Sequence, residues 1–573
     1  MPGRMLARPA RFSCLATATL LSAASLLYPA LTASGTGSLP RPVMVAERTI
    51  TAERLQRHIR VLASDEFEGR GPGTAGEEQT VRYLIDQFQS LGLKAGGTDG
   101  SWTQEVPMMG LTTEEPSMVL KFGTESRHLR YPDEAVIWSK QFVSAQRVWD
   151  SEVVFVGYGV VAPEYGWDDF KGVNVSGKTI VFLINDPPVP DPADPEKLDA
   201  RMFKGRAMTY YGSWTYKFEI AAARCAAAAL IVHEDGPAGY PWSVVVDSNA
   251  QENFELQTAR PRRSHTPIQG WLRSDQARKL FAELGYDFDA LKRRAASKDF
   301  QPVALGARAS LSLKSRQREV RSRNVVARID GADPRQRNEY VAFSAHWDHL
   351  GRDPRLAGDQ IYNGALDNAA GVAALLELGR AFQQLKPAPR RTVLFLAVTA
   401  EEKGLLGSQY YVENPLYPIN GTVANLNMDG GNAWGRTRDV EVIGYGQTTL
   451  EDWLKVAAAR QGRVVTADSE PEKGRIFRSD QFEFAKVGVP ALYLKSGVDY
   501  RGKPADFGRQ KAEEYLQKHY HRLSDEMQPD WDLSGAVEDA RLLFEVGWQA
   551  ATAKGRPAWK AGAEFTSARQ RAH

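Results

Sequence analysis

The stretch that decides the fold begins at residue 340 and reads Y-V-A-F-S-A-H-W-D-H-L-G. The nearly unbroken apolar run from Tyr340 to Ala345 is typical of a buried strand. His346 and Asp348 follow directly where this strand would end. Further on, in G-A-L-D-N-A-A-G, Asp367 stands at the start of a segment with the apolar spacing of a helix. An α/β sheet presents ligands in this way, at the carboxyl edge of its strands.

Strand and helix patterns alternate on both sides of this stretch, after a basic polar segment at 314–323 and through residues 320–555. This alternation predicts the α/β class, with a mixed, largely parallel sheet covered by helices on both faces. The patterns predict strands at 324–329, 340–345, 392–398, 424–428 and 490–495, and helices near 369–385, 407–413, 450–461, 480–487, 511–519 and 534–553.

The length of 573 residues exceeds what one hydrophobic core supports, so we expect more than one domain. Helical patterns early in the chain predict that residues 34–140 are the N-terminal helical part of the same domain, and alternation from about 106 to 146 predicts strands at its edge. Residues 150–290, here called the insert, are β-rich with a helix or two and indicate a separate module. Within it, D-P-P-V-P-D-P-A-D-P-E-K predicts an exposed loop, because its prolines lack backbone donors. Residues 556–573 are expected to form a flexible tail.

The N-terminus has the pattern of a secretory signal. Arg4, Arg8 and Arg11 precede an apolar stretch that ends in small residues. A membrane anchor is the alternative, but Ser, Thr and Pro interrupt the stretch, which is shorter than the ~20 apolar residues of a span. We therefore expect residues 1–33 to be a cleaved signal peptide that leaves no stable membrane span, and the mature chain to be secreted or periplasmic.

The overall composition restricts the partners only slightly. An apolar content of 43% and a charged content of 25% are ordinary for a globular protein. The formal net charge of +2 gives no reason to expect nucleic acid or an anionic membrane as a partner. The sequence does not specify an oligomeric state.

Residues suited to metal binding follow three consecutive strand patterns. Because the carboxyl ends of parallel strands share one edge of a sheet, we expect these side chains to meet. Imidazoles and carboxylates without thiolates suit Zn²⁺, Mn²⁺ or Co²⁺, and two such ions can share a bridging carboxylate. In chain order these residues are His346, Glu401, Glu402 and Asp429, and a further histidine, His521, follows a late helix pattern.

Glu401 and Glu402 are adjacent, so both cannot point at one ion from regular backbone. One of them can bind metal while the other faces the attacking water, as a general base must. Asp348, two residues after His346, can accept the second ring N–H of that histidine and fix its tautomer. His349 has no partner in this scheme and is interpreted either as structural or as a residue that supports the ligands from behind.

As an ordered set, these motifs resemble the M28 family of dinuclear zinc aminopeptidases. The resemblance covers about residues 320–555 and implies a zinc-exopeptidase fold, and the insert is similar to a protease-associated (PA) domain. The motifs that carry it are His346-x-Asp348, G-A-L-D-N-A-A-G around Asp367, Glu401-Glu402, N-M-D-G around Asp429 and Y-H at 520–521.

Carried over position by position, the resemblance implies a role for each residue. Two Zn²⁺ ions would be bound, with Mn²⁺ or Co²⁺ as substitutes, and Asp367 would bridge them. Glu401 would be the general base and Tyr520 would hydrogen-bond the oxyanion. The remaining implied ligands are His346 and Asp429 for one ion and Glu402 and His521 for the other. Asp348 would support the site. Arg478 and Asp480 would support it or bind substrate, and they lie in a segment that has Gln481 where the family usually has a histidine.

The implied function is that of a secreted aminopeptidase acting on peptides with a free N-terminus. Water activated by zinc and deprotonated by Glu401 would attack the scissile carbonyl, while an acidic group holds the free ammonium. Alternatives in the same fold are a carboxypeptidase and a single-zinc glutaminyl cyclase, and a receptor-like binding protein without activity is a different class. The complete ligand set argues against the cyclase and the inactive protein. We expect the insert to be lid-like and to affect substrate range more than metal content.

Overall fold

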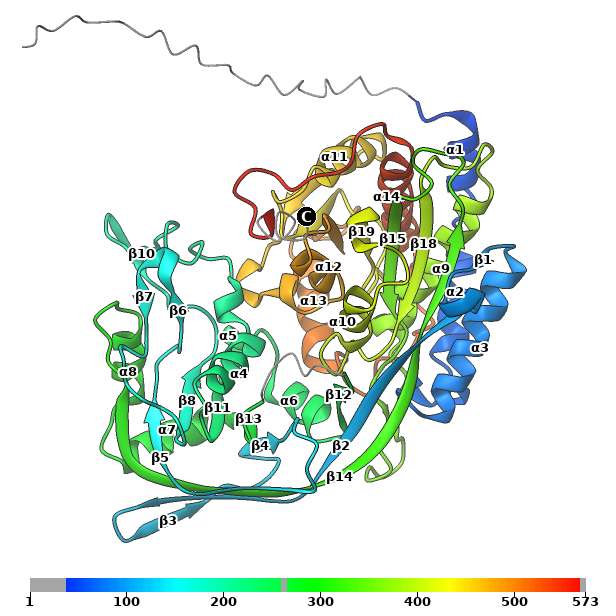
Figure 1. Cartoon of the computed structure of the whole chain (residues 1–573). Coiled ribbons are helices and arrows are strands. Elements are labelled where there is room, and N and C mark those ends of the chain that lie inside the picture. Colours follow the sequence, from blue (N-terminus) through cyan, green and yellow to red (C-terminus); the bar gives the residue numbers. More distant parts are fainter. Residues whose placement is uncertain (1–37, 259–264, 567–573) are drawn as a thin grey trace, which may run out of the picture. The chain divides into compact units, whose positions relative to one another are not determined.

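One large hydrogen-bonded sheet runs through the described part of the chain from Leu39 onward, and these residues form one compact unit (Figure 1). The computed structural model describes residues 38–258 and 265–566, so the predicted signal peptide at 1–33 lies outside the described residues. Within those two ranges, no helix combines the length and the apolar character needed to cross a membrane.

The strands at the centre of residues 320–555 are parallel neighbours. β15 (Tyr340–His346) lies between β18 (Thr392–Val398) and β19 (Thr422–Asn427), and β22 (Ala491–Ser496) follows β19 in the sheet. These four strands run in the same direction, whereas the strands that flank them are antiparallel. The predicted mixed, largely parallel sheet is confirmed.

Two short strands at one edge of the sheet were not predicted. β20 (Asp439–Ile443) pairs antiparallel with β22, and β21 (Val464–Ala467) pairs parallel with β20. These strands have 5 and 4 residues. Apolar runs this short do not stand out from the surrounding sequence, because period-2 alternation needs more residues to be recognised.

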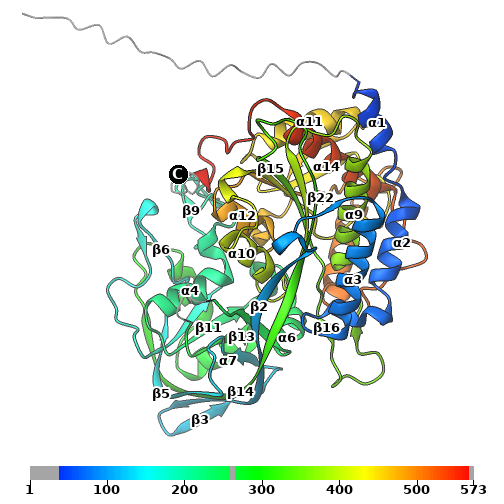
Figure 2. The ribbon, with the colours of Figure 1, turned by 45° about the vertical axis from the view of Figure 1, so that its right-hand side comes forward.

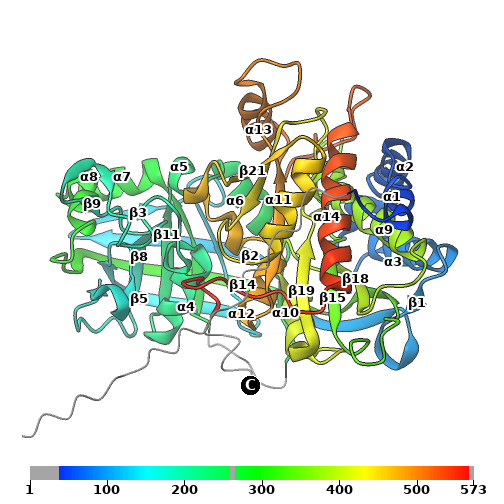
Figure 3. The ribbon, with the colours of Figure 1, turned by 90° about the horizontal axis from the view of Figure 1, so that it is seen from above.

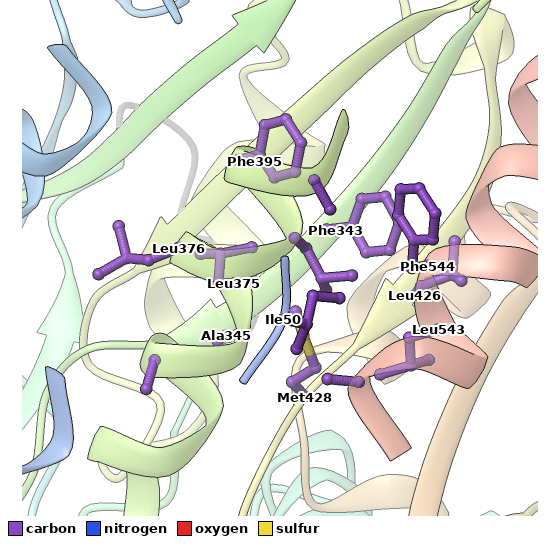
Figure 4. Close-up of a cluster of buried hydrophobic side chains, with 14 of the residues drawn as sticks. Ile50, Phe343, Ala345, Leu375, Leu376, Phe395, Leu426, Met428, Leu543 and Phe544 are labelled. Carbon is purple, nitrogen blue, oxygen red and sulfur yellow. The ribbon is translucent and has the colours of Figure 1, made fainter. Parts of the chain in front are cut away.

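Helices cover both faces of this sheet, as the view in Figure 3 shows. Phe343 and Ala345 of β15 pack with α9 and α14, in the cluster drawn in Figure 4, whereas Ala342 packs on the other face with α10 and α12. Successive side chains of a strand point to opposite faces, so a strand buried on both sides must be apolar throughout. The helices of this region are α9 (Ala370–Gln383), α10 (Leu406–Glu413), α11 (Leu450–Arg460), α12 (Gln481–Lys486), α13 (Phe507–Lys518) and α14 (Ser534–Thr552).

The helices of the N-terminal part end at Ser90, and strands follow where the alternating pattern predicts them, so only the first half of residues 34–140 is helical. The buried residues of its helices belong to the same hydrophobic cluster as α9. Beyond them the chain enters the sheet. The helices are α1 (Arg41–Glu47), α2 (Ala52–Leu62) and α3 (Ala75–Ser90), and the strands that follow are β2 (Thr103–Phe122), β3 (Glu125–His128) and β4 (Ala135–Trp138).

A long strand, β14 (Val303–Ile329), links this region to the insert. It pairs antiparallel with β18 near one end, with β5 (Ala145–Phe155) near the other, and with β2 along most of its length. Figure 1 shows β2 and β14 running side by side. The basic polar segment 314–323 lies within β14, where buried Val320 and Ser322 alternate with exposed Arg321. A strand with one exposed face can carry such charges. These charges are the reason that residues 314–323 were not predicted as a strand.

The insert contains a second run of parallel strands (Figure 2). β5, β8 (Thr179–Leu183), β11 (Ala228–His233) and β13 (Ile268–Arg273) are successive parallel neighbours, and β4 pairs antiparallel with β13. Because β4 and part of β5 precede residue 150, this module begins earlier than predicted. Its helices are α4 (Trp214–Ala223), α5 (Asp235–Ala238), α6 (Trp242–Asn249), α7 (Ser274–Glu283) and α8 (Phe288–Ala295).

Two segments predicted to be irregular are more ordered than expected. The proline-rich loop contains a short hairpin of β9 (Pro190–Asp191) and β10 (Asp194–Leu198). In the described part of the C-terminal tail, the indole N–H of Trp559 donates to the carbonyl of Gly488 at 2.9 Å, and Phe565 is buried. The remaining short strands are β1 (Lys94–Ala95), β6 (Val161–Ala162), β7 (Trp167–Asp168), β12 (Asn253–Leu256), β16 (Gly351–Arg352) and β17 (Ile361–Tyr362).

Candidate metal centre

The carboxyl ends of β18, β15 and β19 bring polar residues to one edge of the sheet. His346 is the last residue of β15 and pairs with Val398, the last residue of β18. Glu401 and Glu402 follow β18 closely, and Asp429 follows β19. The three strands are parallel neighbours, so the residues after them converge although they are far apart in the sequence.

Asp367 reaches the same edge from the turn that precedes α9. The backbone N–H groups of Leu366 and Asp367 donate to the carboxylate of Asp525 at 3.1 and 3.0 Å. The side-chain amide of Asn368 donates to the carbonyl of His346 at 3.3 Å, and the peptide bond between Asp367 and Asn368 is cis. These hydrogen bonds fix the turn beside the end of β15.

The carboxylate of Asp367 lies between two histidines. Its Oδ1 is 3.4 Å from Nε2 of His346, and its Oδ2 is 3.3 Å from Nε2 of His521. Oδ1 of Asp429 is 3.4 Å from the same nitrogen of His346. Oε2 of Glu402 is 3.0 Å from the same nitrogen of His521. Each histidine therefore shares Asp367 and has one further carboxylate beside it.

These residues fit a site for a metal ion such as zinc. Nε2 of His521 is buried and makes no hydrogen bond within the described residues, although it faces two carboxylates. A buried polar atom without a partner is unfavourable, and a cation among these ligands would satisfy it. Imidazole and carboxylate ligands suit zinc. Two groups have ligand atoms within 4.8 Å of one another: His346, Asp367 and Glu402, and His346, Glu401 and Asp429.

Residues 324–544 match the sequence model of peptidase family M28. This part of the chain is an M28 domain. A probable zinc metalloprotease of Pyrenophora teres f. teres (strain 0-1) is 36% identical over 106 residues, and leupeptin-inactivating enzyme 1 of Streptomyces exfoliatus is 29% identical over 178 residues. The two matches cover 18% and 31% of this chain and 22% and 36% of those relatives, so the chain spans well under half of their length.

The likeness to a solved structure extends beyond the M28 domain. An aminopeptidase from Aneurinibacillus sp. strain AM-1 has a TM-score of 0.51 and 18% sequence identity, covering 90% of this chain and 97% of that chain. At this identity the likeness shows the fold alone. It supports the zinc-exopeptidase arrangement of the sheet and includes most of the residues outside the family match.

Asp348 of the M28 domain does not hold His346 in the way we expected. Nδ1 of His346 is 3.1 Å from the backbone carbonyl oxygen of Asp348, whereas the Asp348 carboxylate is 3.8 Å away. That carboxylate instead accepts the backbone N–H groups of Glu401 and Glu402 at 3.1 and 3.4 Å. Asp348 therefore orders the turn after β18, and burial raises the pKa of its carboxyl to about 7.

The two adjacent glutamates of the M28 domain differ in their electrostatics. Burial raises the pKa of Glu401 well above its usual range, against the opposing effect of nearby His346. Burial acts on Glu402 in the same direction, but His521 and His349 outweigh it and lower the pKa of Glu402 to about 2. Glu402 thus remains a carboxylate, which suits a ligand. Glu401 accepts a proton readily, which suits acid–base chemistry.

Tyr520 and Arg478 lie beside the ligand cluster. The ring of Tyr520 is 4.0 Å from the ring of His521, centroid to centroid, and burial raises the pKa of Tyr520 well above its usual value. Its hydroxyl therefore stays protonated and can donate. The guanidinium of Arg478 stacks on Tyr240 of the insert, 4.9 Å from the ring centroid, which places a cation at the junction of the insert and the M28 domain.

Asp480 is buried behind the cluster and does not contact either cavity described below, as far as the described residues show. Its Oδ1 accepts the hydroxyl of Ser408 at 2.6 Å, and burial raises the pKa of its carboxyl to about 7. The neighbouring Gln481 accepts the amide of Asn427 at 2.9 Å. Both residues order the sheet edge from behind, so of the two roles predicted for Asp480 the geometry favours support of the site over substrate contact.

Sequence reasoning missed two residues that stand next to the cluster, Arg70 and Asp525, and it gave His349 a supporting role without naming its partner. The guanidinium of Arg70 is buried and donates to the carbonyl of Trp347 at 2.9 Å. Nδ1 of His349 is 2.6 Å from Oε1 of Glu402. Both His349, the second histidine of H-W-D-H, and Arg70, in the glycine-dense segment E-G-R-G-P-G at 68–73, were visible in the sequence. Asp525 had no local signal, because its partners are backbone amides of a distant turn.

Two cavities meet at the cluster. The insert-side cavity, of about 600 Å³, is lined by Glu401 and by aromatic residues of the insert that include Trp271. The core-side cavity, of about 760 Å³, is lined by Asp429 and by residues of the M28 domain. Arg478 and Tyr520 line both cavities. The site is thus accessible from two directions and has the polar residues of a hydrolase at their junction.

Proposed function

We propose that this chain is an exported dinuclear zinc aminopeptidase that removes N-terminal residues from peptides. The observation that carries the proposal is the Asp367 carboxylate between Nε2 of His346 and Nε2 of His521, at 3.4 and 3.3 Å. A carboxylate shared by two histidine-containing groups has the position of a bridging ligand. The M28 domain supports peptides as substrates, and export rests on the signal pattern at residues 1–33.

The two histidines divide the proposed ligands into two sets. His346 and Asp429 would hold one zinc ion, and Glu402 and His521 would hold the other, with Asp367 between them. When bound, the two ions would supply Lewis-acid chemistry: they would polarise the scissile carbonyl and lower the pKa of the attacking water, so that it loses a proton more easily. The chain's own residues then have to orient the substrate and move protons.

Glu401 is the proposed general base. Its raised pKa allows it to take a proton from the attacking water and later to give that proton to the leaving amine. Because Glu401 lines the insert-side cavity, the leaving part of the peptide would occupy that cavity. The N-terminal residue would then occupy the core-side cavity beside Asp429, where a carboxylate can attract the free ammonium.

Tyr520 and Arg478 would assist from the junction of the two cavities. The Tyr520 hydroxyl, kept protonated by burial, would donate a hydrogen bond to the oxyanion that develops at the scissile carbonyl. Arg478 would lie along the peptide backbone, since it lines both cavities. These roles predict that both residues affect kcat more than they affect zinc content.

The test combines zinc analysis with a substrate panel. We expect about two zinc ions per chain by elemental analysis, together with hydrolysis of aminoacyl p-nitroanilides and of short peptides with a free N-terminus. N-acetylated versions of the same peptides should resist hydrolysis. A chelator should abolish the activity, and zinc or cobalt should restore it. Release of C-terminal residues from N-acetylated peptides would indicate a carboxypeptidase, and chelator-insensitive hydrolysis would refute the metal mechanism.

A further inference from the structure

The end of helix α6 in the insert reaches the metal centre of the M28 domain. Oγ of Ser248 is 2.8 Å from Nδ1 of His521. The backbone carbonyl of the same serine accepts the ammonium of Lys403 at 3.0 Å. Next to it, the carboxylate of Asp247 is 3.1 Å from the guanidinium of Arg522. One turn of the insert therefore touches both chain segments that carry the ligands of the second ion.

The contact with Ser248 has a direct consequence for the chemistry of His521. A neutral imidazole that binds metal through Nε2 must carry its proton on Nδ1. A hydroxyl oxygen at 2.8 Å accepts that N–H and so fixes both the tautomer and the ring orientation. Nε2 then faces Oδ2 of Asp367 and Oε2 of Glu402, at 3.3 and 3.0 Å.

The other histidine of the site is held without the insert. Nδ1 of His346 is 3.1 Å from the backbone carbonyl of Asp348, two residues further along the same chain segment. A backbone carbonyl of the M28 domain therefore orients one ligand, and a side chain of the insert orients the other. The two halves of the site should depend on the insert to different degrees.

We propose that Ser248 is a positioning residue, through which the insert holds His521 in the orientation that the second half of the metal site requires. This inference rests on the proposed function, because it takes His521 as a ligand. The insert then becomes part of the metal centre in addition to any lid-like role. Removal of the insert should lower metal content, contrary to our expectation from the sequence that substrate range would change more.

The contact of Ser248 with His521 links the insert to the metal centre more directly than the neighbouring ion pair of Asp247 and Arg522 does. The side chains of Arg522 and Asp247 are 37% and 17% exposed, so solvent screens their attraction. Lys403 is buried and donates to the carbonyl of Ser248, which anchors the serine backbone next to Glu402. The backbone of Ser248 is thus fixed by Lys403 while its hydroxyl contacts His521.

Zinc titration of the metal-free full chain tests the proposal without relying on activity. Ser248→Ala should weaken one of the two binding events by about 10–100-fold and leave the other unchanged, as loss of a ligand's hydrogen-bond partner does at other metal sites. Ser243→Ala is the matched control on the same helix, because Oγ of Ser243 makes no hydrogen bond within the described residues. This control should titrate like the wild type.

A second pair of variants separates the hydroxyl from the shape of the side chain. Ser248→Thr keeps the hydroxyl and should bind zinc like the wild type, whereas Ser248→Val has nearly the same shape and should weaken the second event. The visible spectrum of the cobalt-substituted protein should change in the valine variant, because the second ion changes its surroundings. If the alanine variant does not fold, the comparison of the threonine and valine variants still tests the role of the Ser248 hydroxyl.

The outcomes distinguish this inference from the proposed function. A wild-type chain that takes up no zinc would refute the proposed function, and the inference would fail with it. A wild-type chain with two binding events, both unchanged by Ser248→Ala and by Ser248→Val, would refute the role of Ser248 and leave the proposed function intact.

Discussion

The M28 domain and the insert each contain a run of parallel strands, and in both regions polar residues stand at the strand ends. In the M28 domain His346 ends β15 and Asp429 follows β19. In the insert Asp186 follows β8, and His233 ends β11. Inspection of strand ends alone would therefore select both edges as candidate metal sites.

In the insert, the polar residues at the strand ends form hydrogen bonds with other residues of the insert. The carboxylate of Asp186 accepts the backbone N–H and the hydroxyl of Thr209 at 2.6 and 2.8 Å. Burial raises the pKa of the Asp186 carboxyl to about 7, and the buried ammonium of Lys217 opposes this shift without cancelling it. Nε2 of His233 is 3.1 Å from the carboxylate of Asp235. In the described ranges, both groups that could hold a metal lie at the M28 edge.

A buried imidazole nitrogen without a hydrogen bond is not enough to identify a ligand. Nδ1 of His233 lacks a partner among the described residues, as Nε2 of His521 does. The ring of His233 is surrounded by aromatic rings that include Trp271, at 5.5 Å between centroids. His521 instead faces carboxylates of two other segments. Convergence of anionic groups therefore distinguishes a metal site from a packed histidine.

The largest expected effect comes from making the same substitution at both edges. Asp367→Asn should lose zinc and lower kcat/KM by a factor on the order of 10³ or more, because the proposed bridging ligand loses its charge. Asp186→Asn should retain zinc and most of the activity. Elemental analysis and initial rates measure both. Equal zinc content in the two variants would remove the distinction between the edges.

Adjacent substitutions in the M28 domain sharpen the assignment of roles. Glu401→Gln should keep its zinc and lose about 10²–10⁴-fold in kcat, because the proton acceptor is gone. Glu402→Gln should lose zinc instead, since a ligand has been neutralised. Zinc analysis beside steady-state kinetics separates the two cases. Unchanged turnover in Glu401→Gln would exclude it as the base.

The buried charges of the insert should matter for stability and little for zinc. Lys217→Met removes the buried ammonium that donates to the carbonyls of Tyr158 and Asn185 at 2.7 and 3.1 Å. It should lower the free energy of unfolding by about 1–3 kcal/mol, because buried acceptors lose their donor. Lys197→Met is the control, because Lys197 forms an exposed ion pair with Asp194 that is worth about 1 kcal/mol or less. Urea denaturation measures both. Similar stability of the two variants would contradict a structural role for Lys217.

The smallest effect is expected at the pair of His233 and Asp235 in the insert. The side chain of Asp235 is 65% exposed, so Asp235→Asn should change the free energy of unfolding by about 1 kcal/mol or less. Zinc content should stay at the wild-type value, in contrast to Glu402→Gln. A loss of zinc in Asp235→Asn would point to a metal site in the insert after all.

The central strands could be predicted from the sequence because each is a short apolar run that ends in a polar residue. β15, β18 and β19 are buried on both faces, so their residues have no polar alternation to obscure them. Of β14 only the last part, at 324–329, was predicted, because half of its middle section faces solvent and carries arginines. The sequence predicted that the Asp348 carboxylate accepts the ring N–H of His346, but the backbone carbonyl of Asp348 lies closer to that nitrogen. Both groups of one residue can reach the ring, and the sequence does not show which of them does.

The sequence by itself determined the residue types of the candidate site and the strands that carry them, because local apolar patterns govern strand formation and polar residues mark the strand ends. Only the tertiary structure decided which side chains meet. The 2.8 Å contact of Ser248 with His521 joins residues 273 positions apart. Such a contact depends on how two packed regions lie against each other, and no local pattern encodes that.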